Sequence, residues 1–181
     1  MSKRWLSLAG VIFFLLAVFC AGFVFFYNRM QRSQAVAPAP PPGRLIDKPF
    51  PHAKLSDVYG TKVDEQILRT GRVVVVFITI DCDACAAESK FLEPLTGRRK
   101  DVAFYGLVPF GPRVKSPDDA AKKFPFRIFY DEGGSFLAQM GINRVPVKVF
   151  LEDGIIRKGW IGAAISDKDQ KSFIEWLDSL P

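Results

Sequence analysis

Two cysteines, Cys82 and Cys85, are separated by two residues and give the chain a C-x-x-C motif. Thiols at this spacing can exchange disulfides, form a structural disulfide, or supply half of a zinc site. A zinc site needs two further ligands, and of three cysteines and one histidine only Cys20 and His52 remain. The C-x-x-C-H pattern of haem attachment is absent, because residue 86 is alanine. The motif therefore predicts redox exchange, with a structural disulfide as the alternative.

A strand and a helix must hold the two thiols in place. The β-branched run of residues 72–80 is typical of a strand that is covered on both faces. Residues 84–95 read as a helix whose last turn is frayed by Pro94. Cys82 would then precede the helix N-terminus, where free N–H groups and the macrodipole stabilise a thiolate. Cys85 would lie one turn later on the same side, placed to attack a mixed disulfide formed by Cys82.

The rest of the chain alternates strands with helices, which indicates an α/β domain with a mixed central sheet. An Asp153-Gly154 turn signal joins two strands in a hairpin, and Ser166 is the expected N-cap of the last helix. The basic run Arg98-Arg99-Lys100 is interpreted as a solvated helix exit. Further strands are expected at residues 102–108, 127–130, 147–151 and 155–160, and a short helix at residues 118–123.

Pro146 directly precedes the predicted strand of residues 147–151. Proline has no N–H to donate to a neighbouring strand, so its position at a strand start needs a reason. A cis Val145–Pro146 bond would supply one. A trans proline at the first residue of a strand is the alternative, and the dipeptide by itself does not decide between them.

Three segments together resemble a known family. Residues 73–88 look like the active-site strand, C-x-x-C motif and helix start of thioredoxin-like proteins, and residues 141–155 look like their cis-proline segment. Residues 54–60 are similar to the N-terminal hairpin of the membrane-anchored TlpA/ResA type. The resemblance covers residues 45–180 and implies a thioredoxin-like fold in a thiol–disulfide oxidoreductase of this redoxin family. The two motifs in this order are far more specific than either alone.

The resemblance also implies roles for individual residues. Cys82 would be the exposed nucleophile and Cys85 the resolving cysteine of a redox-active disulfide. Pro146 would lie against the disulfide, and Val145 would present its backbone to the bound client. Glu88 matches a family glutamate and would accept a proton or tune the pair, with a solvated helix charge as the alternative. No metal ion or other cofactor is expected.

The motif departs from the family pattern at two positions. Asp81 replaces the usual tryptophan before the first cysteine, and Ala84 replaces the familiar proline between the cysteines. Asp81 and Asp83 flank Cys82 with negative charge, which raises the pKa of its thiol and opposes the helix dipole. We therefore expect a disulfide reductase rather than an oxidase. The missing aromatic side chain also removes part of the family's docking surface.

Residues 5–27 form an apolar segment of 23 residues without a charge. As a helix they would span roughly 34 Å, enough for a hydrocarbon core of about 30 Å. A cleaved signal peptide has a shorter apolar region, and proline follows the available Ala-Val-Ala site at residues 35–37. The sequence therefore predicts four parts: a short cytoplasmic N-terminus (1–4), an uncleaved transmembrane signal-anchor (5–27), a Pro/Ala-rich linker (28–43) and the thioredoxin-like domain (44–181).

The net charge of +6 is unevenly distributed along the chain. Residues 1–43 carry four basic side chains and no acidic one, whereas residues 44–181 carry a net charge of only +2. Most of the excess therefore borders the apolar segment, and no nucleic-acid partner is expected.

The leading hypothesis is a membrane-tethered oxidoreductase that reduces disulfides of client proteins. It would be a single-pass protein of a bacterial inner membrane with its domain in the periplasm. The resemblance implies a membrane electron-donor protein as partner, and cytochrome c maturation or other client-specific reduction as the process. The alternative is a non-catalytic scaffold or a metal chaperone. Copper chaperones of this fold use C-x-x-x-C and a downstream histidine, and no histidine follows His52.

Overall fold

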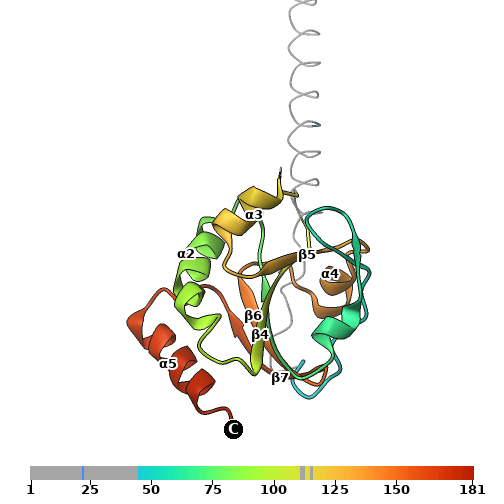
Figure 1. Cartoon of the computed structure of the whole chain (residues 1–181). Coiled ribbons are helices and arrows are strands. Elements are labelled where there is room, and N and C mark those ends of the chain that lie inside the picture. The colour runs from blue at the N-terminus through green and yellow to red at the C-terminus, as the bar shows by residue number, and fades with distance from the viewer. Residues whose placement is uncertain (1–21, 23–44, 111–112, 115) are drawn as a thin grey trace, which may run out of the picture. The chain divides into compact units, whose positions relative to one another are not determined.

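The valine-rich run around residue 75 becomes an interior strand of a seven-stranded mixed sheet, counted over the described residues (Figure 1). The strand order is β2-β1-β5-β4-β3-β6-β7. β3 pairs in parallel with β4 and antiparallel with β6, and β7 follows β6 in a hairpin. The strands are β1 (Leu55–Ser56), β2 (Lys62–Val63), β3 (Arg72–Phe77), β4 (Val102–Val108), β5 (Arg127–Asp131), β6 (Val147–Glu152) and β7 (Ile155–Ile161). The predicted mixed sheet is confirmed.

The computed structural model describes residues 22, 45–110, 113–114 and 116–181. The chain divides into two units, residues 1–37 and 38–181, and the sheet belongs to the second. The predicted membrane helix of residues 5–27 and the predicted linker lie outside the described residues, apart from Gly22. Within the described part, no helix has the length and apolarity needed to cross a bilayer.

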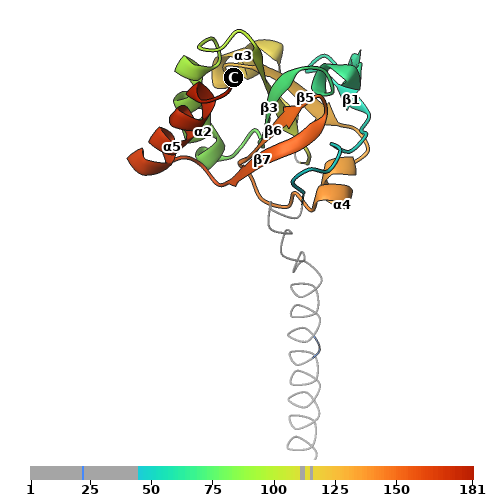
Figure 2. The same ribbon diagram turned by 90° about the horizontal axis from the view of Figure 1, so that it is seen from below.

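Helices cover both faces of the sheet because the side chains of β3 alternate between two cores. Val74 and Val76 pack with residues of α2 and α5, whereas Val73 and Val75 pack with residues of α4 and of the 3-10 helix η2. Figure 2 shows α4 on the opposite side of the sheet from α2 and α5. The helices are η2 (Glu65–Leu68), α2 (Asp83–Leu92), η3 (Glu93–Leu95), α3 (Pro117–Lys123), α4 (Ser135–Met140) and α5 (Asp167–Asp178).

The predicted element boundaries hold with small differences. β3 ends at Phe77 and not at residue 80, because the chain leaves the ladder after Ile78, whose N–H still bonds Leu107 O at 3.0 Å. α2 ends at Leu92, and the turn that contains Pro94 is the 3-10 helix η3. Ser166 caps α5 as predicted, accepting from Asp169 N at 3.1 Å. The hairpin expected at residues 54–60 is present and extends through β2 to residue 63.

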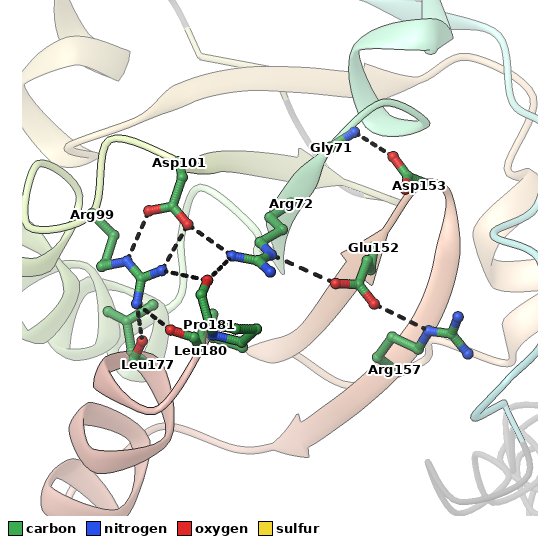
Figure 3. Close-up of polar contacts among 10 residues, drawn as sticks. All are labelled: Gly71, Arg72, Arg99, Asp101, Glu152, Asp153, Arg157, Leu177, Leu180 and Pro181. Carbon is green, nitrogen blue, oxygen red and sulfur yellow. Dashed lines mark hydrogen bonds and ion pairs between the residues drawn. The ribbon is translucent and has the colours of Figure 1, made fainter.

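A polar cluster, the C-terminal clasp, joins α5 to the sheet at the start of β3 (Figure 3). The cysteines follow the other end of β3. We define the clasp as Arg72, Arg99, Asp101 and the backbone oxygens of residues 177, 180 and 181. Arg99 donates two hydrogen bonds to Asp101, at 2.7 and 2.8 Å, and others to Leu177 O and Leu180 O. Arg72 donates to Asp101 at 3.0 Å and to Pro181 O.

The interpretation of residues 98–100 as a solvated helix exit is wrong for Arg99. Its side chain is 21% exposed and is directed into the clasp. The hydrogen bonds from Arg99, helped by Arg72, hold the pKa of Asp101 well below its ordinary value. Arg98 fits the interpretation better, because it is exposed and forms a surface ion pair with Asp178 at 2.6 Å. The local sequence does not show that Arg99 also binds the backbone oxygens of Leu177 and Leu180, which lie 78 and 81 positions later.

Candidate redox site

Cys82 and Cys85 form a disulfide at the N-terminus of α2, with their Cα atoms 5.2 Å apart. Cys82 is the N-cap residue, in an extended conformation, and its Sγ accepts from Cys85 N at 3.1 Å. The helix N-terminus therefore directs an N–H group at the sulfur of Cys82, which favours a thiolate on that atom. Cys82 is half-buried, whereas Cys85 is fully buried. This asymmetry leaves the first sulfur accessible from solvent and not the second.

Glu88 lies one turn beyond Cys85, and its carboxylate is buried rather than solvated. The side chain is 0% exposed, which contradicts the alternative of a solvated helix charge. Its Oε2 accepts from Ala164 N at 2.6 Å, and its Oε1 lies 2.6 Å from Lys148 Nζ. Cys85 and Glu88 are both buried residues of α2, three positions apart, and therefore share one helix face.

The Val145–Pro146 peptide bond is cis, and it precedes β6 at the edge of the sheet where β3 ends. Phe77 and Val147 are register partners, so this dipeptide and the loop that leads to Cys82 leave the sheet at the same end. Gly162 N donates to Pro146 O at 2.9 Å and holds the dipeptide to the end of β7. Val145 is half-buried and packs against both cores. The structure thus brings both sequence motifs to one end of the sheet.

Asp81 and Asp83 are exposed on either side of Cys82. They line a groove of about 670 Å³ that runs from Cys82 along α2 to the end of α3. Three lysines, Lys90, Lys122 and Lys123, also line this groove, together with Phe124 and Pro125. The groove offers an open, charged surface beside the accessible sulfur.

Two features of the site were missed by reasoning from the sequence. Lys148 lies within a predicted apolar strand, although a single charge within Val-Lys-Val-Phe-Leu is itself a signal. The groove wall at Lys122 and Lys123 depends on how α3 packs beside α2, which no local pattern shows. Among the described residues, no cluster of histidine, cysteine and carboxylate side chains could hold a metal ion.

Residues 46–173 match the family model named Redoxin. The chain belongs to the redoxin family. This redoxin is 30% identical over 169 residues to the thiol:disulfide interchange protein DsbE of Pseudomonas fluorescens biotype C. The aligned residues cover 88% of this chain and 86% of that protein.

Solved structures share the fold. A secreted disulfide oxidoreductase of Mycobacterium tuberculosis, homologous to E. coli DsbE, matches with a TM-score of 0.58 at 22% identity, over 70% of this chain and 95% of that one. Peroxidoxin BcpB of the same organism matches with a TM-score of 0.60 at 18% identity, over 75% and 97%. These matches bear out the predicted thioredoxin-like α/β fold of the described domain.

Proposed function

We propose that this redoxin is a thiol–disulfide oxidoreductase that reduces disulfides of client proteins through Cys82 and Cys85. The observation that carries the proposal is the disulfide at the start of α2, with one half-buried and one buried sulfur. The relationship to a thiol:disulfide interchange protein over most of the chain supports it. The groove of about 670 Å³ beside Cys82 would give a client segment an open surface next to that sulfur.

The exchange proceeds in two steps. In the reduced protein, the Cys82 thiolate attacks a client disulfide, forms a mixed disulfide with one client sulfur and releases the other as a thiol after it takes up a proton. Cys85 then gives its proton to Glu88 and attacks the Cys82 sulfur. The Cys82–Cys85 disulfide forms, the second client sulfur leaves, and the proton passes from Glu88 to it. Two electrons have moved from the cysteine pair to the client.

The test is to trap the mixed disulfide. In a Cys85→Ser variant the second step is blocked, so disulfide-linked adducts through Cys82 should accumulate with specific clients. Cys82→Ser is the matched control and should accumulate none. A non-catalytic scaffold would give no adducts with either variant and would keep its biological function when both cysteines are serine. That result would reject the proposal.

The reducing direction is part of the proposal and rests on Asp81 and Asp83. Their negative charges disfavour a thiolate at Cys82, and a less acidic thiol is typical of a reducing pair. Equilibration with glutathione measures the potential directly. A potential as oxidising as that of disulfide-forming catalysts, about −120 mV, would contradict the reductase direction.

We also propose that residues 5–27 tether the domain to a bacterial inner membrane, with the domain in the periplasm. The 23-residue uncharged segment supports this proposal, and so does the clustering of basic residues beside it. A membrane electron-donor protein would then reduce the Cys82–Cys85 disulfide after each cycle. The full-length chain should stay with the membrane after alkaline carbonate extraction. Release into the supernatant would contradict the tether.

A further inference from the structure

Lys148 is a buried cation that the two exchange steps leave without a role. It is the second residue of β6, among apolar neighbours, and its side chain is 1% exposed. Side chains alternate along a strand, so Lys148 and Phe150 share the face that α2 and α5 cover. An apolar side chain would be the ordinary occupant of this position.

The ammonium of Lys148 binds the carboxylate that lies one turn beyond Cys85. Nζ is 2.6 Å from Glu88 Oε1, 3.4 Å from Gly162 O and 5.6 Å from the ring centroid of Phe173. The contact with Oε1 is an ion pair without hydrogen-bond geometry. Among the described residues no donor is hydrogen-bonded to Oε1, so this oxygen can still accept a hydrogen bond. With Ala164 N on Oε2, the carboxylate is fixed between α2, β6 and the segment that follows β7.

Stability alone is a poor reason for this pair. Removing two charges from water costs several kcal/mol per ion, and replacing a buried pair by apolar side chains is often neutral or stabilising. Removing one partner is different, because it leaves the other charge buried and uncompensated. Each charge of the pair therefore affects the ionisation of a neighbouring group. Cys85 is such a group, because it lies one helical turn from Glu88.

The charged groups of the neighbouring elements are exposed or make other contacts. Asp81 and Asp83 are exposed at the mouth of the groove. On β7, Lys158 lies against the rings of Trp160 and Trp176. From α5, Gln170 is a neutral side chain that donates to Ala164 O, beside the N–H that Glu88 accepts from, at 2.9 Å. Of the described charged side chains, Lys148 is the one paired with Glu88.

We propose that Lys148 is a positioning residue for thiol–disulfide exchange, which holds the Glu88 carboxylate and cancels its charge so that the buried Cys85 can lose its proton. The inference rests on the proposed function. With the pair intact, the cluster is neutral before Cys85 ionises. Without Lys148, the lone carboxylate opposes a thiolate at Cys85. Without the Glu88 charge, the lone ammonium favours one.

The two halves of the pair should therefore act in opposite directions. In a Cys20→Ser/Cys82→Ser background, the ultraviolet absorbance of the Cys85 thiolate is followed across a series of pH values, with the variant that lacks all three cysteines as the blank, because this readout needs no reagent to reach the buried sulfur. Lys148→Met should raise the pH midpoint of thiolate formation by about one unit, and Glu88→Gln should lower it by a similar amount. Lys158→Met is the matched control and should leave the midpoint unchanged.

Shifts in the same direction for both variants, or shifts no larger than that of Lys158→Met, would overturn the proposal and leave the pair a structural role. If Lys148→Met does not fold, the double variant Lys148→Met/Glu88→Gln carries neither charge and replaces it in the comparison. Its midpoint should lie above that of Glu88→Gln, and an equal or lower midpoint would overturn the proposal. No client enters this assay, so failure of client trapping would count against the proposed function alone.

Discussion

Cys82 is subject to two opposing electrostatic effects, one from the backbone and one from its neighbours. The Cys85 N–H and the helix N-terminus favour a thiolate on its sulfur. Asp81 and Asp83 oppose that charge, but both are exposed, so water and salt screen their effect. The balance of these effects sets how much of Cys82 is reactive at neutral pH.

Replacing one of these carboxylates should make Cys82 more reactive. In reduced Asp83→Asn, the pH midpoint of Cys82 alkylation is expected to fall by several tenths of a unit at low salt, because a neighbouring negative charge is gone. The variant should also lose about 0.3–1 kcal/mol of stability, since Asp83 occupies the first turn of α2. Glu93→Gln removes a carboxylate from the same groove beyond α2 and should leave the midpoint in place. A midpoint that does not respond at low salt would contradict this account.

The residue types at the site were largely predictable, but their surroundings were not. The spacing of Cys82, Cys85 and Glu88 along one helix is visible in the sequence, because helical periodicity fixes which side chains share a face. The partner of Glu88 comes from β6, sixty positions later. Only the three-dimensional packing of α2 on the sheet brings Lys148 to it.

At the scale of the elements, the packing of β4 requires a glycine at position 106. A Cβ at Gly106 would lie 2.8 Å from Phe126 Cε2 and would also meet Ile128 Cδ1. Gly106→Ala should therefore destabilise the fold by about 1–3 kcal/mol, as overpacked cores do. Gly97→Ala is the matched control, since nothing lies within 4 Å of its added Cβ. Urea unfolding measures both, and equal stabilities would contradict the predicted overpacking.

The N-cap of α5 gives a second prediction for an element. Ser166 Oγ accepts from Asp169 N at 3.1 Å and so satisfies one of the free donors of the first turn. Ser166→Ala should cost about 1 kcal/mol of unfolding free energy. Ser172→Ala changes an exposed serine inside the same helix and should be neutral or slightly stabilising, because alanine is the better helix former. Thermal or urea unfolding that ranked the two variants the other way would contradict the capping role.

The elements that sequence patterns located well are those with a long, regular signal. β4 has the predicted bounds, and the other predicted strands differ by a few residues at their ends. The short α4 was not expected, since six residues after Gly134 give too little periodicity. The order of strands in the sheet also lay beyond local patterns, because it depends on pairings such as β1 with β5 across more than seventy residues.

At the scale of the whole molecule, the sheet carries reactive groups at one end and the C-terminal clasp at the other. The cysteines follow the end of β3, whereas Arg72 begins it and meets Asp101, Pro181 O and Glu152 (Figure 3). The clasp holds the end of α5 against the first residue of β3 and the residue that precedes β4. Because α5 shares a core with α2, the clasp supports the helix layer that contains the redox site.

Arg99→Gln should weaken the domain at neutral pH and less so in acid. The folded pKa of Asp101 is lowered, chiefly by its hydrogen bonds from Arg99, so its ionised form adds stability above the ordinary aspartate pKa of about 3.9. That contribution is lost as the pH falls toward the folded pKa. The gap in urea stability between wild type and Arg99→Gln should therefore be constant near neutrality and shrink below about pH 4.

Acid also lowers the stability of wild type and of Arg99→Gln through groups that are the same in both. The difference in stability between the two proteins removes this shared loss. The Ser56 hydrogen bond and Arg113 lower the pKa of Glu132, which is unchanged in the variant. Arg98→Gln is the matched control, because its exposed pair with Asp178 is worth little to stability. The Arg98→Gln curve should follow the wild type at every pH, since this variant leaves the clasp intact. The difference in urea stability between wild type and Arg99→Gln should exceed the difference for Arg98→Gln and shrink in acid. Equal differences for the two variants, or a difference for Arg99→Gln that stays constant into acid, would show that the clasp does not hold α5 to the sheet through Asp101.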